Sequence, residues 1–508
     1  MKIVLINPFI TVRDPNIYLS EPLGLVCLAS YIKQIFNDKV QVSILDLYAL
    51  GAMTPKKKND FYILGIDDEE YIRSEIQKLS PDLIGITCNF TAYADDSLEV
   101  ATMVKKILPH IPIVMGGAHA TIEAESILKN NECIDYIIRN EGEITLGYLV
   151  RALRGEHTVE SIEGLTYRTP DKTIVSNPGR ELIKNLDMLP IPDRTFIDME
   201  RYKYFNKKCV WYIRQEPVAT IMTSRGCPYN CVFCSTKVVW QRQWRPRSLE
   251  KVFEEIELLV SKYGIKEIII NDDQFFIKKK RVINFCDYFI KRKLKLSFAV
   301  DAGISVWLVD EESLEKMRKA GFYSLRFPIE SGNENTLKFI QKPVDLKKTK
   351  ELIIKATKMG FWTSANFIIG FPYETREEID ETIRYAYSSA LDYTSFLIAK
   401  PNAGSDLYEI FKKEGLLEKN VVRASHFYRS DYDTTTMKAE ELNDIIDKAS
   451  KGWYIHKLIF FMNPINFFSY LLPKFRSIED LKYFFKVFGA LFSIKIKPIF
   501  KKTILARE

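Results

Sequence analysis

Short apolar runs alternate with amphipathic stretches along the first 150 residues. Runs of four to six mostly apolar residues are typical of strands buried on both faces, and residues 97–108 carry apolar side chains at helical spacing. Alternation of this kind predicts an α/β fold, with a parallel, doubly wound Rossmann-like sheet over residues 1–150. The predicted strands are residues 2–7, 41–45, 83–88, 111–115 and 136–139.

The same alternation returns between residues 216 and 420, now with longer helices. Six strand–helix units are too few for a complete eight-stranded barrel. We therefore predict an open (βα)6 partial TIM barrel, with its site at the carboxyl ends of the strands. The predicted strands are residues 218–223, 267–271, 296–300, 324–329, 364–369 and 394–399, and the predicted helices are 249–263, 281–292, 312–320, 346–359 and 376–390.

Two further regions complete the predicted organisation. Residues 151–215 are predicted to form a connector, in which residues 164–168 and 173–175 pair as a hairpin. Prolines at positions 190 and 192 mark the boundary that follows. Residues 421–508 are predicted to form a helical, basic and aromatic C-terminal region.

Charge is distributed unevenly along the chain. The formal net charge is +7, yet residues 451–508 alone hold 11 Lys and Arg against 3 Asp and Glu. The remaining 450 residues hold 62 basic and 63 acidic side chains. A balanced body of this kind favours small-molecule partners and argues against nucleic acid as a partner.

The basic C-terminal stretch also holds 14 aromatic residues, and Asn463, Pro464 and Asn466 interrupt its most apolar part. Basic residues beside Trp and Phe fit a segment that lies on anionic lipid, or a lid over an apolar substrate. A pair of helices packed back on the barrel explains the same pattern. Nucleic-acid binding is the weakest interpretation, because adjacent aromatic pairs suit packing better than base stacking.

Eight cysteines in 508 residues are too few for a disulfide framework, so we expect reduced thiols. The first ten residues read as a strand, with no signal-peptide cleavage site after them. No run of about 20 apolar residues occurs. These features predict a cytoplasmic protein, with peripheral membrane contact left open.

Three of the cysteines stand together at Cys227, Cys231 and Cys234, directly after a predicted strand. Structural zinc usually takes four protein ligands in two separate pairs. Three thiols on one loop indicate instead an iron–sulfur cluster with one iron left open to another ligand. The alternatives are a zinc site completed by Cys209 or Cys286, or three inert thiols.

This loop resembles that of the radical S-adenosylmethionine (SAM) superfamily. In that family three cysteines hold a [4Fe–4S] cluster, SAM binds the fourth iron, and reductive cleavage yields a 5′-deoxyadenosyl radical. The resemblance implies that Cys227, Cys231 and Cys234 are cluster ligands and that an electron donor such as flavodoxin or ferredoxin is a partner. It also implies SAM contacts by Phe233, Asp272, Asp273, Arg326, Glu330 and Gly370. Each polar position has a structural interpretation too, as a solvated turn or a helix start.

A doubly wound domain ahead of such a barrel resembles the cobalamin-binding subfamily. The resemblance implies cobalamin contacts at four places where small or polar residues follow a predicted strand. These residues are Leu23, Gly24, Thr87, Asn89, Gly116, Gly117, His119, Glu141 and Gly142.

One departure from the cobalamin pattern concerns the cobalt ligand. Domains that bind cobalt through a histidine carry Asp-x-His-x-x-Gly, whereas this chain has Asp46, Tyr48 and Gly51 at those places. A phenol with a pKa near 10 is a poor cobalt ligand, so we expect no histidine ligand from this loop. His119 would contact the cofactor periphery or cap a helix. The alternative is that the domain keeps the fold and has lost cobalamin.

The family resemblance implies methylation of an unactivated carbon, in a small-molecule or lipid-like substrate. Some relatives with the same two cofactors perform ring closure or rearrangement, and the sequence leaves that alternative open. A non-catalytic iron–sulfur or zinc sensor is a third alternative from another class.

Overall fold

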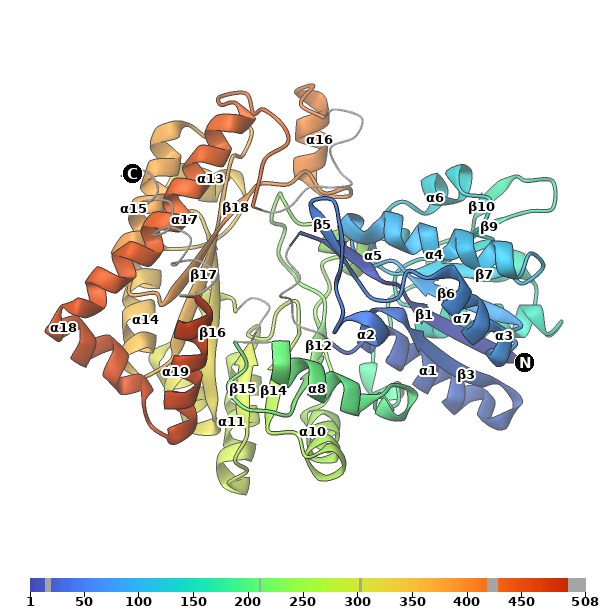
Figure 1. Cartoon of the computed structure of the whole chain (residues 1–508), viewed down its shortest axis with the longest axis horizontal. Helices are drawn as coiled ribbons and strands as arrows, with labels where there is room; N and C mark the ends of the chain where they lie inside the picture. Colours follow the sequence, from blue (N-terminus) through green and yellow to red (C-terminus); the bar gives the residue numbers. More distant parts are fainter. Residues whose placement is uncertain (14–19, 210–211, 301–303, 418–427, 492–508) are drawn as a thin grey trace. The chain divides into compact units, whose positions relative to one another are not determined.

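The computed structural model describes residues 1–13, 20–209, 212–300, 304–417 and 428–491 (Figure 1). The chain divides into two compact units. The first comprises Met1–Val210 and Ser235–Leu258, and the second comprises Trp211–Cys234 and Leu259–Glu508. Each unit is described by itself below.

A seven-stranded sheet forms the centre of the first unit, in the order β10-β9-β8-β7-β6-β1-β3. Strands β3, β1, β6, β7 and β8 run parallel, whereas β9 and β10 add to the edge in antiparallel fashion. The doubly wound parallel core is therefore confirmed, and so is the predicted hairpin. The strands are β1 (Lys2–Asn7), β3 (Gln41–Asp46), β6 (Leu83–Thr87), β7 (Ile113–Gly116), β8 (Tyr136–Ile138), β9 (Leu165–Arg168) and β10 (Ile174–Ser176).

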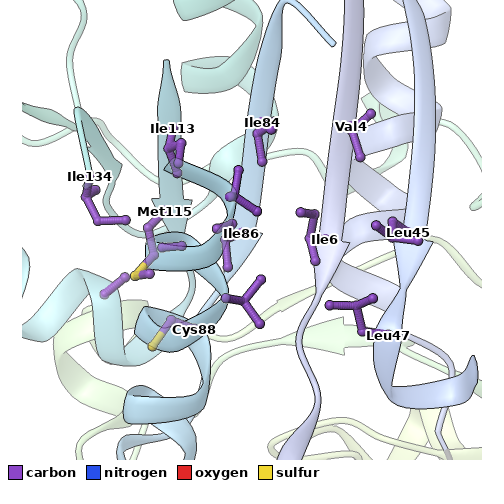
Figure 2. Close-up of a cluster of buried hydrophobic side chains, with 14 of the residues drawn as sticks. Val4, Ile6, Leu45, Leu47, Ile84, Ile86, Cys88, Ile113, Met115 and Ile134 are labelled. Atoms are coloured by element: carbon purple, nitrogen blue, oxygen red, sulfur yellow. The ribbon is translucent and has the colours of Figure 1, made fainter. Parts of the chain in front are cut away.

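Helices cover both faces of this sheet because its apolar side chains alternate between the two sides. Val4, Ile6, Ile84 and Ile86 point to one face and form a buried cluster (Figure 2). Side chains of α3 (Glu69–Leu79), α4 (Ala94–Ile107) and α6 (Ala124–Asn130) complete that cluster. Ile3 and Leu5 point to the other face, against α1 (Leu23–Phe36) and α7 (Gly142–Leu153). Smaller elements are α2 (Leu47–Gly51), α5 (Ala118–Ile122) and a three-stranded sheet of β2 (Ile10–Val12), β5 (Phe61–Leu64) and β4 (Lys56–Lys58).

The units differ from the predicted domain boundaries in two segments. Most of the segment predicted as a connector, residues 151–215, belongs to the first unit, because β9 and β10 extend its sheet. Residues 235–258, predicted as part of the barrel, also belong there. Two buried ion pairs hold that second segment: Arg245 Nη1 lies 2.7 Å from Glu141 Oε2, and Arg194 Nη1 lies 2.7 Å from Glu255 Oε1.

Six parallel strands form the sheet of the second unit, in the order β11-β14-β15-β16-β17-β18. Chain order and sheet order agree, so the predicted (βα)6 partial barrel is confirmed. The strands are β11 (Val218–Ile221), β14 (Glu267–Ile270), β15 (Ser297–Val300), β16 (Phe322–Glu330), β17 (Trp362–Ile369) and β18 (Tyr393–Ile398). The helices include α11 (Lys279–Arg292), α12 (Glu311–Ala320), α13 (Glu334–Phe339), α14 (Leu346–Lys358), α15 (Arg376–Ser388) and α16 (Asp406–Lys413).

Burial alternates strictly along the later strands of this sheet. In β17 the buried Phe367 packs on Tyr385 of α15, with ring centroids 6.3 Å apart, so the buried face is the one that the helices cover. The intervening Ser364, Asn366 and Ile368 are half-exposed and point to the inner face. The side chains of the inner face are therefore less completely buried than those that face the helices.

Two long C-terminal helices pack back on the second unit, α17 (Ala439–Met462) and α19 (Ile478–Leu491), and the short α18 (Pro464–Asn466) follows α17; they are drawn in orange and red in Figure 1. Tyr483 of α19 packs edge-on against Tyr323 and Trp362, at 5.5 Å from each ring. Because these two residues lie at the amino ends of β16 and β17, α19 covers that end of the barrel. The predicted helical C-terminal region is confirmed for the described residues, and α19 is no lid over the opposite end. Lys457 and Lys474 are buried, which differs from the solvated lysines expected of a helical pair packed on the barrel.

No helix in the described ranges is long and apolar enough to cross a membrane. Residues 492–508, the end of the basic stretch, lie outside the described residues.

Candidate functional site

The three cysteines lie on the loop that follows β11, at the carboxyl end of the barrel, and all three are half-buried. Burial raises the pKa of the Cys227 thiol to about 12 and also raises the pKa of Cys231. In both cases the neighbouring cysteine thiols raise the pKa further. The three thiols therefore lie close enough together for their charges to interact.

Contacts from distant parts of the second unit fix this loop. The N–H of Val232 donates to the Ile340 carbonyl at 3.2 Å, and the Val232 carbonyl accepts from the N–H of Leu407 at 2.9 Å. Asn230 Nδ2 donates to Gln341 Oε1 at 2.8 Å. Because both neighbours of Cys231 are anchored in this way, the loop is held in place by the protein itself.

Asp272 holds the start of the same loop. Its carboxylate accepts hydrogen bonds from the hydroxyls of Thr223 and Ser224, each at 2.6 Å, and from the N–H of Thr223 at 2.5 Å. Burial nevertheless raises the pKa of Asp272. The side chain is 0% exposed because its oxygens are bonded to Thr223 and Ser224, and its contact with SAM stays a prediction. Asp273 is half-exposed and accepts the N–H of Gly226 at 3.1 Å, and its contact with SAM stays a prediction.

The donor set fits a cluster of several irons. Within the described part of the chain, no group of three or more His, Cys, Asp or Glu side chains is arranged to hold one metal ion. In a [4Fe–4S] cluster each thiolate binds a different iron, so the three thiols need not converge on one point. Cys286, proposed for the zinc alternative, is fully buried within α11. The side chain of Cys209 lies outside the described residues.

Next to the loop, Glu330 at the end of β16 forms a buried ion pair with Lys342. The Lys342 Nζ lies 2.7 Å from Glu330 Oε1, and the two side chains are 5% and 8% exposed. Lys342 Nζ also lies 5.9 Å from the centre of the Phe233 ring, and its charge lowers the pKa of Cys231. Glu330 has a backbone φ of +69°, which is uncommon for a residue other than glycine and typical of functional sites.

Phe233, Arg326 and Gly370 occupy different levels of the barrel. Phe233 is half-buried, with its ring centre 6.3 Å from that of Phe371. Arg326 is half-exposed on the inner face, near the middle of β16. Gly370 is buried in the turn after β17, where its N–H donates to Glu374 Oε2 at 2.7 Å. The SAM contacts of these three residues stay predictions.

Lys342 and the polar inner-face residues Ser364, Asn366 and Ser395 were not predicted from the sequence. Lys342 lies 12 residues after Glu330, and only the fold shows that the two meet. The inner-face residues left a readable signal, because polar residues at alternate positions are unusual in parallel strands. Register places Asn366 beside Ser395 and Ser364 beside Arg326, so polar side chains are neighbours across adjacent strands.

In the first unit, one group of predicted cobalamin residues meets at the carboxyl ends of β6 and β7. Thr87 is the register partner of Gly116. A Cβ on Gly117 would lie 2.6 Å from Asn89 Oδ1, and Gly117 has a φ of +117°, so only glycine fits there. His119 is buried, with its Nδ1 3.0 Å from the Thr91 hydroxyl. The structure thus brings Thr87, Asn89, Gly116, Gly117 and His119 together.

The other predicted cobalamin residues lie at the N-termini of α1 and α7. Leu23 is buried, whereas Gly24 is exposed and a Cβ on it would meet nothing within 4 Å. The Glu141 carboxylate is buried and accepts the Ile183 N–H at 2.7 Å as well as the Arg245 guanidinium. The Glu141 side chain is therefore bonded to other residues of the protein interior. A Cβ on Gly142 would lie 3.1 Å from Leu28 of α1, which shows that the two helix starts are adjacent.

The Asp46–Tyr48 segment provides no histidine. Asp46 caps α2 by accepting the Ala49 N–H at 3.0 Å, and it also accepts from Asn7 Nδ2 at 2.8 Å and from the Tyr202 hydroxyl. Burial raises the pKa of Asp46. Tyr48 is 8% exposed. The segment is thus built into the protein core, and the absence of a histidine ligand from it stays a prediction about cobalt.

Two protein-family models match the chain. The model described as the radical SAM superfamily matches residues 221–386, and the one described as the B12 binding domain matches residues 18–150. Together they cover the regions in which the cysteine loop and the doubly wound sheet lie.

Curated relatives extend over most of the chain. An uncharacterized methyltransferase of Pyrococcus horikoshii is 33% identical over 85% of this chain and 88% of the relative. The cytidylyl-2-hydroxyethylphosphonate methyltransferase of Streptomyces wedmorensis is 28% identical over 82% of this chain and 83% of the relative. The anaerobic magnesium-protoporphyrin IX monomethyl ester cyclase of Rubrivivax gelatinosus is 30% identical over 78% and 68%, respectively.

The chain is therefore an enzyme of the radical SAM superfamily, and it belongs to the members that carry a cobalamin-binding domain ahead of the radical SAM domain. Its cofactors are a [4Fe–4S] cluster, SAM and cobalamin. Membership of this superfamily of enzymes argues against the alternative of a non-catalytic sensor.

Two solved structures share the fold. The radical SAM methyltransferase TsrM from Kitasatospora setae, with tryptophan and a SAM analogue bound, has a TM-score of 0.65 and 19% identity over 81% of this chain and 76% of TsrM. The cobalamin-dependent enzyme OxsB, with aqua-cobalamin and SAM bound, has a TM-score of 0.68 and 16% identity over 95% of this chain and 70% of OxsB.

Proposed function

We propose that this enzyme transfers a methyl group from SAM to an unactivated carbon of a small-molecule or lipid-like substrate. The observation that carries the proposal is the arrangement at the carboxyl end of the barrel. There an anchored loop with three thiols lies beside Phe233 and the buried Glu330–Lys342 pair. Two of the relatives described above are methyltransferases by name.

When bound, the cluster, SAM and cobalamin supply a 5′-deoxyadenosyl radical and a transferable methyl group. Cys227, Cys231 and Cys234 would hold the cluster, and their thiols must lose protons to do so. Phe233 would pack on the adenine of SAM. Asp273 and Glu330 would accept hydrogen bonds from its amino group and ribose.

Further residues would orient SAM and cobalamin. Arg326 would donate to the SAM carboxylate, and Gly370 would border the adenine. In the first unit, the open space at Gly24 would admit part of a large ligand, and Gly116 and Gly117 would border it with Thr87, Asn89 and His119 as polar partners. Leu23, Glu141 and Gly142 would support this edge from the helix starts.

The substrate would lie against the inner face of the barrel, where half-exposed polar and apolar side chains alternate across the strands. Ser364, Asn366 and Ser395 offer hydrogen bonds, while Ile368 and Leu397 offer apolar contact. Such a mixed surface suits an amphiphilic molecule. One relative in this size range, at 24% identity, is the hopanoid C-3 methylase of Methylococcus capsulatus.

A second candidate is ring closure with the same cofactors. The observation in its favour is the 30% identity to the cyclase of Rubrivivax gelatinosus, over 404 residues. The two reactions differ in the fate of the SAM methyl group: methyl transfer releases S-adenosylhomocysteine, whereas ring closure consumes SAM only to 5′-deoxyadenosine and methionine.

The experiment uses anaerobically reconstituted full-length enzyme with dithionite, cobalamin and SAM labelled in its methyl group. The acceptors are a hopanoid and magnesium-protoporphyrin IX monomethyl ester. We expect 5′-deoxyadenosine and S-adenosylhomocysteine together, with the label carried into product. 5′-Deoxyadenosine without S-adenosylhomocysteine would support the cyclase, and absence of both from protein with a full cluster would refute both candidates.

The remaining proposals concern partners and location. A flavodoxin or ferredoxin would donate the electron for SAM cleavage, in place of dithionite. We further propose a cytoplasmic location, with contact to a membrane surface through the C-terminal region, which is argued next.

A further inference from the structure

The C-terminal helices of the second unit expose an unusual share of large apolar side chains. The described residues hold twenty such exposed side chains, and eleven of them lie between positions 455 and 488. We call these eleven the C-terminal apolar face. Its most exposed members are Met462, Ile465, Ile459, Phe468, Phe485 and Ile478, with exposed fractions from 79% down to 58%.

The face is a property of the helices and not of loose ends. Ile455, Ile459 and Met462 lie four and three residues apart on α17, and positions 478, 481, 485 and 488 follow the same spacing on α19. Each stripe lies on one side of its helix. The other sides are packed on the barrel, through the buried Trp453 on α17 and Tyr483 on α19. The fold therefore fixes both helices on the barrel and leaves these apolar side chains exposed on their outer sides.

Charge has been removed from this face by burial. Between Lys451 and Arg476 the chain has two charged residues, Lys457 and Lys474, and they are only 7% and 0% exposed. Lys474 Nζ pairs with Asp392 Oδ2 at 2.8 Å. Lys457 lies 4.1 Å from the centre of the Phe460 ring, and burial lowers its pKa to about 8. Both ammonium groups point inward, so the outer surface of this segment is neutral.

A basic rim surrounds the neutral area. Lys451, Arg476 and Lys482 are exposed at its borders, and Lys451 also lies 3.4 Å from Asp447. Apolar side chains bordered by cations match the layers of an anionic bilayer, in which acyl chains lie beneath phosphate groups.

We propose that the C-terminal apolar face docks on the surface of an anionic lipid bilayer, with its apolar side chains in the interface and its basic rim against the headgroups. A second copy of this chain fits the same face less well. A two-fold interface places the same surface on both sides, so two basic rims would meet and repel each other. The proposal concerns location and is independent of the reaction assigned above.

Vesicle flotation of the full-length enzyme tests the proposal. The vesicles contain either phosphatidylcholine alone or phosphatidylcholine and phosphatidylglycerol in equal amounts. We expect the protein to float with the anionic vesicles, to float less with the neutral ones, and to be released by high salt. Met462→Asp should reduce binding about tenfold or more, since it places a charge in the interface.

Met188→Asp is the matched control, because Met188 is also an exposed methionine, at 49%, and lies in the first unit. It should float like the unchanged protein, and both variants should keep the unfolding midpoint. Failure to float with anionic vesicles would overturn the proposal, as would equal flotation of the two variants. Light scattering without vesicles is measured as well. If the unchanged protein is a dimer and Met462→Asp is a monomer, the face belongs to a second copy instead.

Discussion

Lys342 and Glu330 form an ion pair at 2.7 Å that is almost completely withdrawn from water, and it lies beside the cysteine loop. Gln341, the neighbour of Lys342, bonds to Asn230 within that loop. One short segment thus holds both the loop and the carboxylate predicted to contact SAM. Buried pairs of this kind are costly to break, because the remaining charge has no partner.

We predict that Lys342→Met lowers the free energy of unfolding by about 3–5 kcal/mol, the usual effect of leaving a buried carboxylate unpaired. Adding Glu330→Gln should recover part of the loss. Lys348→Met is the control: Lys348 is 83% exposed and lies 3.5 Å from Asp345, so its loss should cost less than about 1 kcal/mol. Denaturant unfolding is measured for the unchanged protein, Lys342→Met, Glu330→Gln, the double variant and Lys348→Met. Additive effects of the Lys342 and Glu330 changes would contradict this account.

A second prediction separates the cluster thiols from the structural ones. Cys231→Ala should lose the iron–sulfur absorbance after anaerobic reconstitution and should release no 5′-deoxyadenosine, because one iron loses its thiolate. Cys286→Ala should keep both, since Cys286 is fully buried within α11. Iron, sulfide and zinc analysis of the two variants checks the result. Stoichiometric zinc that is present in the unchanged protein and absent from Cys231→Ala would favour the zinc alternative.

The third prediction concerns pH. Burial raises the pKa of Glu374 from its ordinary value near 4.5 to about 8, although its carboxylate accepts the N–H groups of Gly370 and Phe371. In this range the folded state holds a proton that the unfolded state has lost. Stability therefore falls as pH rises from about 4.5 to about 8, by about 1.4 kcal/mol per pH unit for this group.

Glu374→Gln removes that titration. We expect the difference in unfolding free energy between the unchanged protein and Glu374→Gln to decrease steadily from pH 5 to pH 8, with other groups cancelling in the comparison. Glu377→Gln, which changes an exposed carboxylate in the first turn of α15, should show a flat difference. A flat difference for Glu374→Gln as well would show that Glu374 is ionised in the folded protein.

The fourth prediction tests the cobalamin edge of the first unit. Gly24 lies in the first turn of α1, and an added Cβ would have no atom from a neighbouring part of the protein within 4 Å. Gly24→Leu should therefore raise stability by up to about 1 kcal/mol, because Leu is a better helix former. It should weaken cobalamin binding about tenfold or more, as measured by equilibrium titration of the visible spectrum.

Gly179→Leu is the control for that titration, since a Cβ added at Gly179 also meets nothing within 4 Å. It should bind cobalamin like the unchanged protein. Unchanged binding by Gly24→Leu would place cobalamin away from the start of α1.

The sequence located the strands well because most of them are buried on both faces and read as apolar runs. Eleven predicted strands of the two main parallel sheets agree with the structure to within two residues at each end. Local spacing also sufficed for Cys227, Cys231 and Cys234, which share one loop. The burial of Asp272 and the pairing of Lys342 with Glu330 could not be predicted from local spacing. Whether a carboxylate faces a ligand or the interior, and which lysine pairs with it, depends on residues far away in the chain.

The basic C-terminal stretch shows the same division. The sequence by itself determined its charge, its aromatic content and its breaks at Asn463 and Pro464. Only the tertiary structure decided that α19 covers the amino end of the barrel, that Lys457 and Lys474 turn inward, and that apolar side chains remain outside. The physical reason is that composition and spacing are local, whereas burial is settled by what each helix face meets after folding.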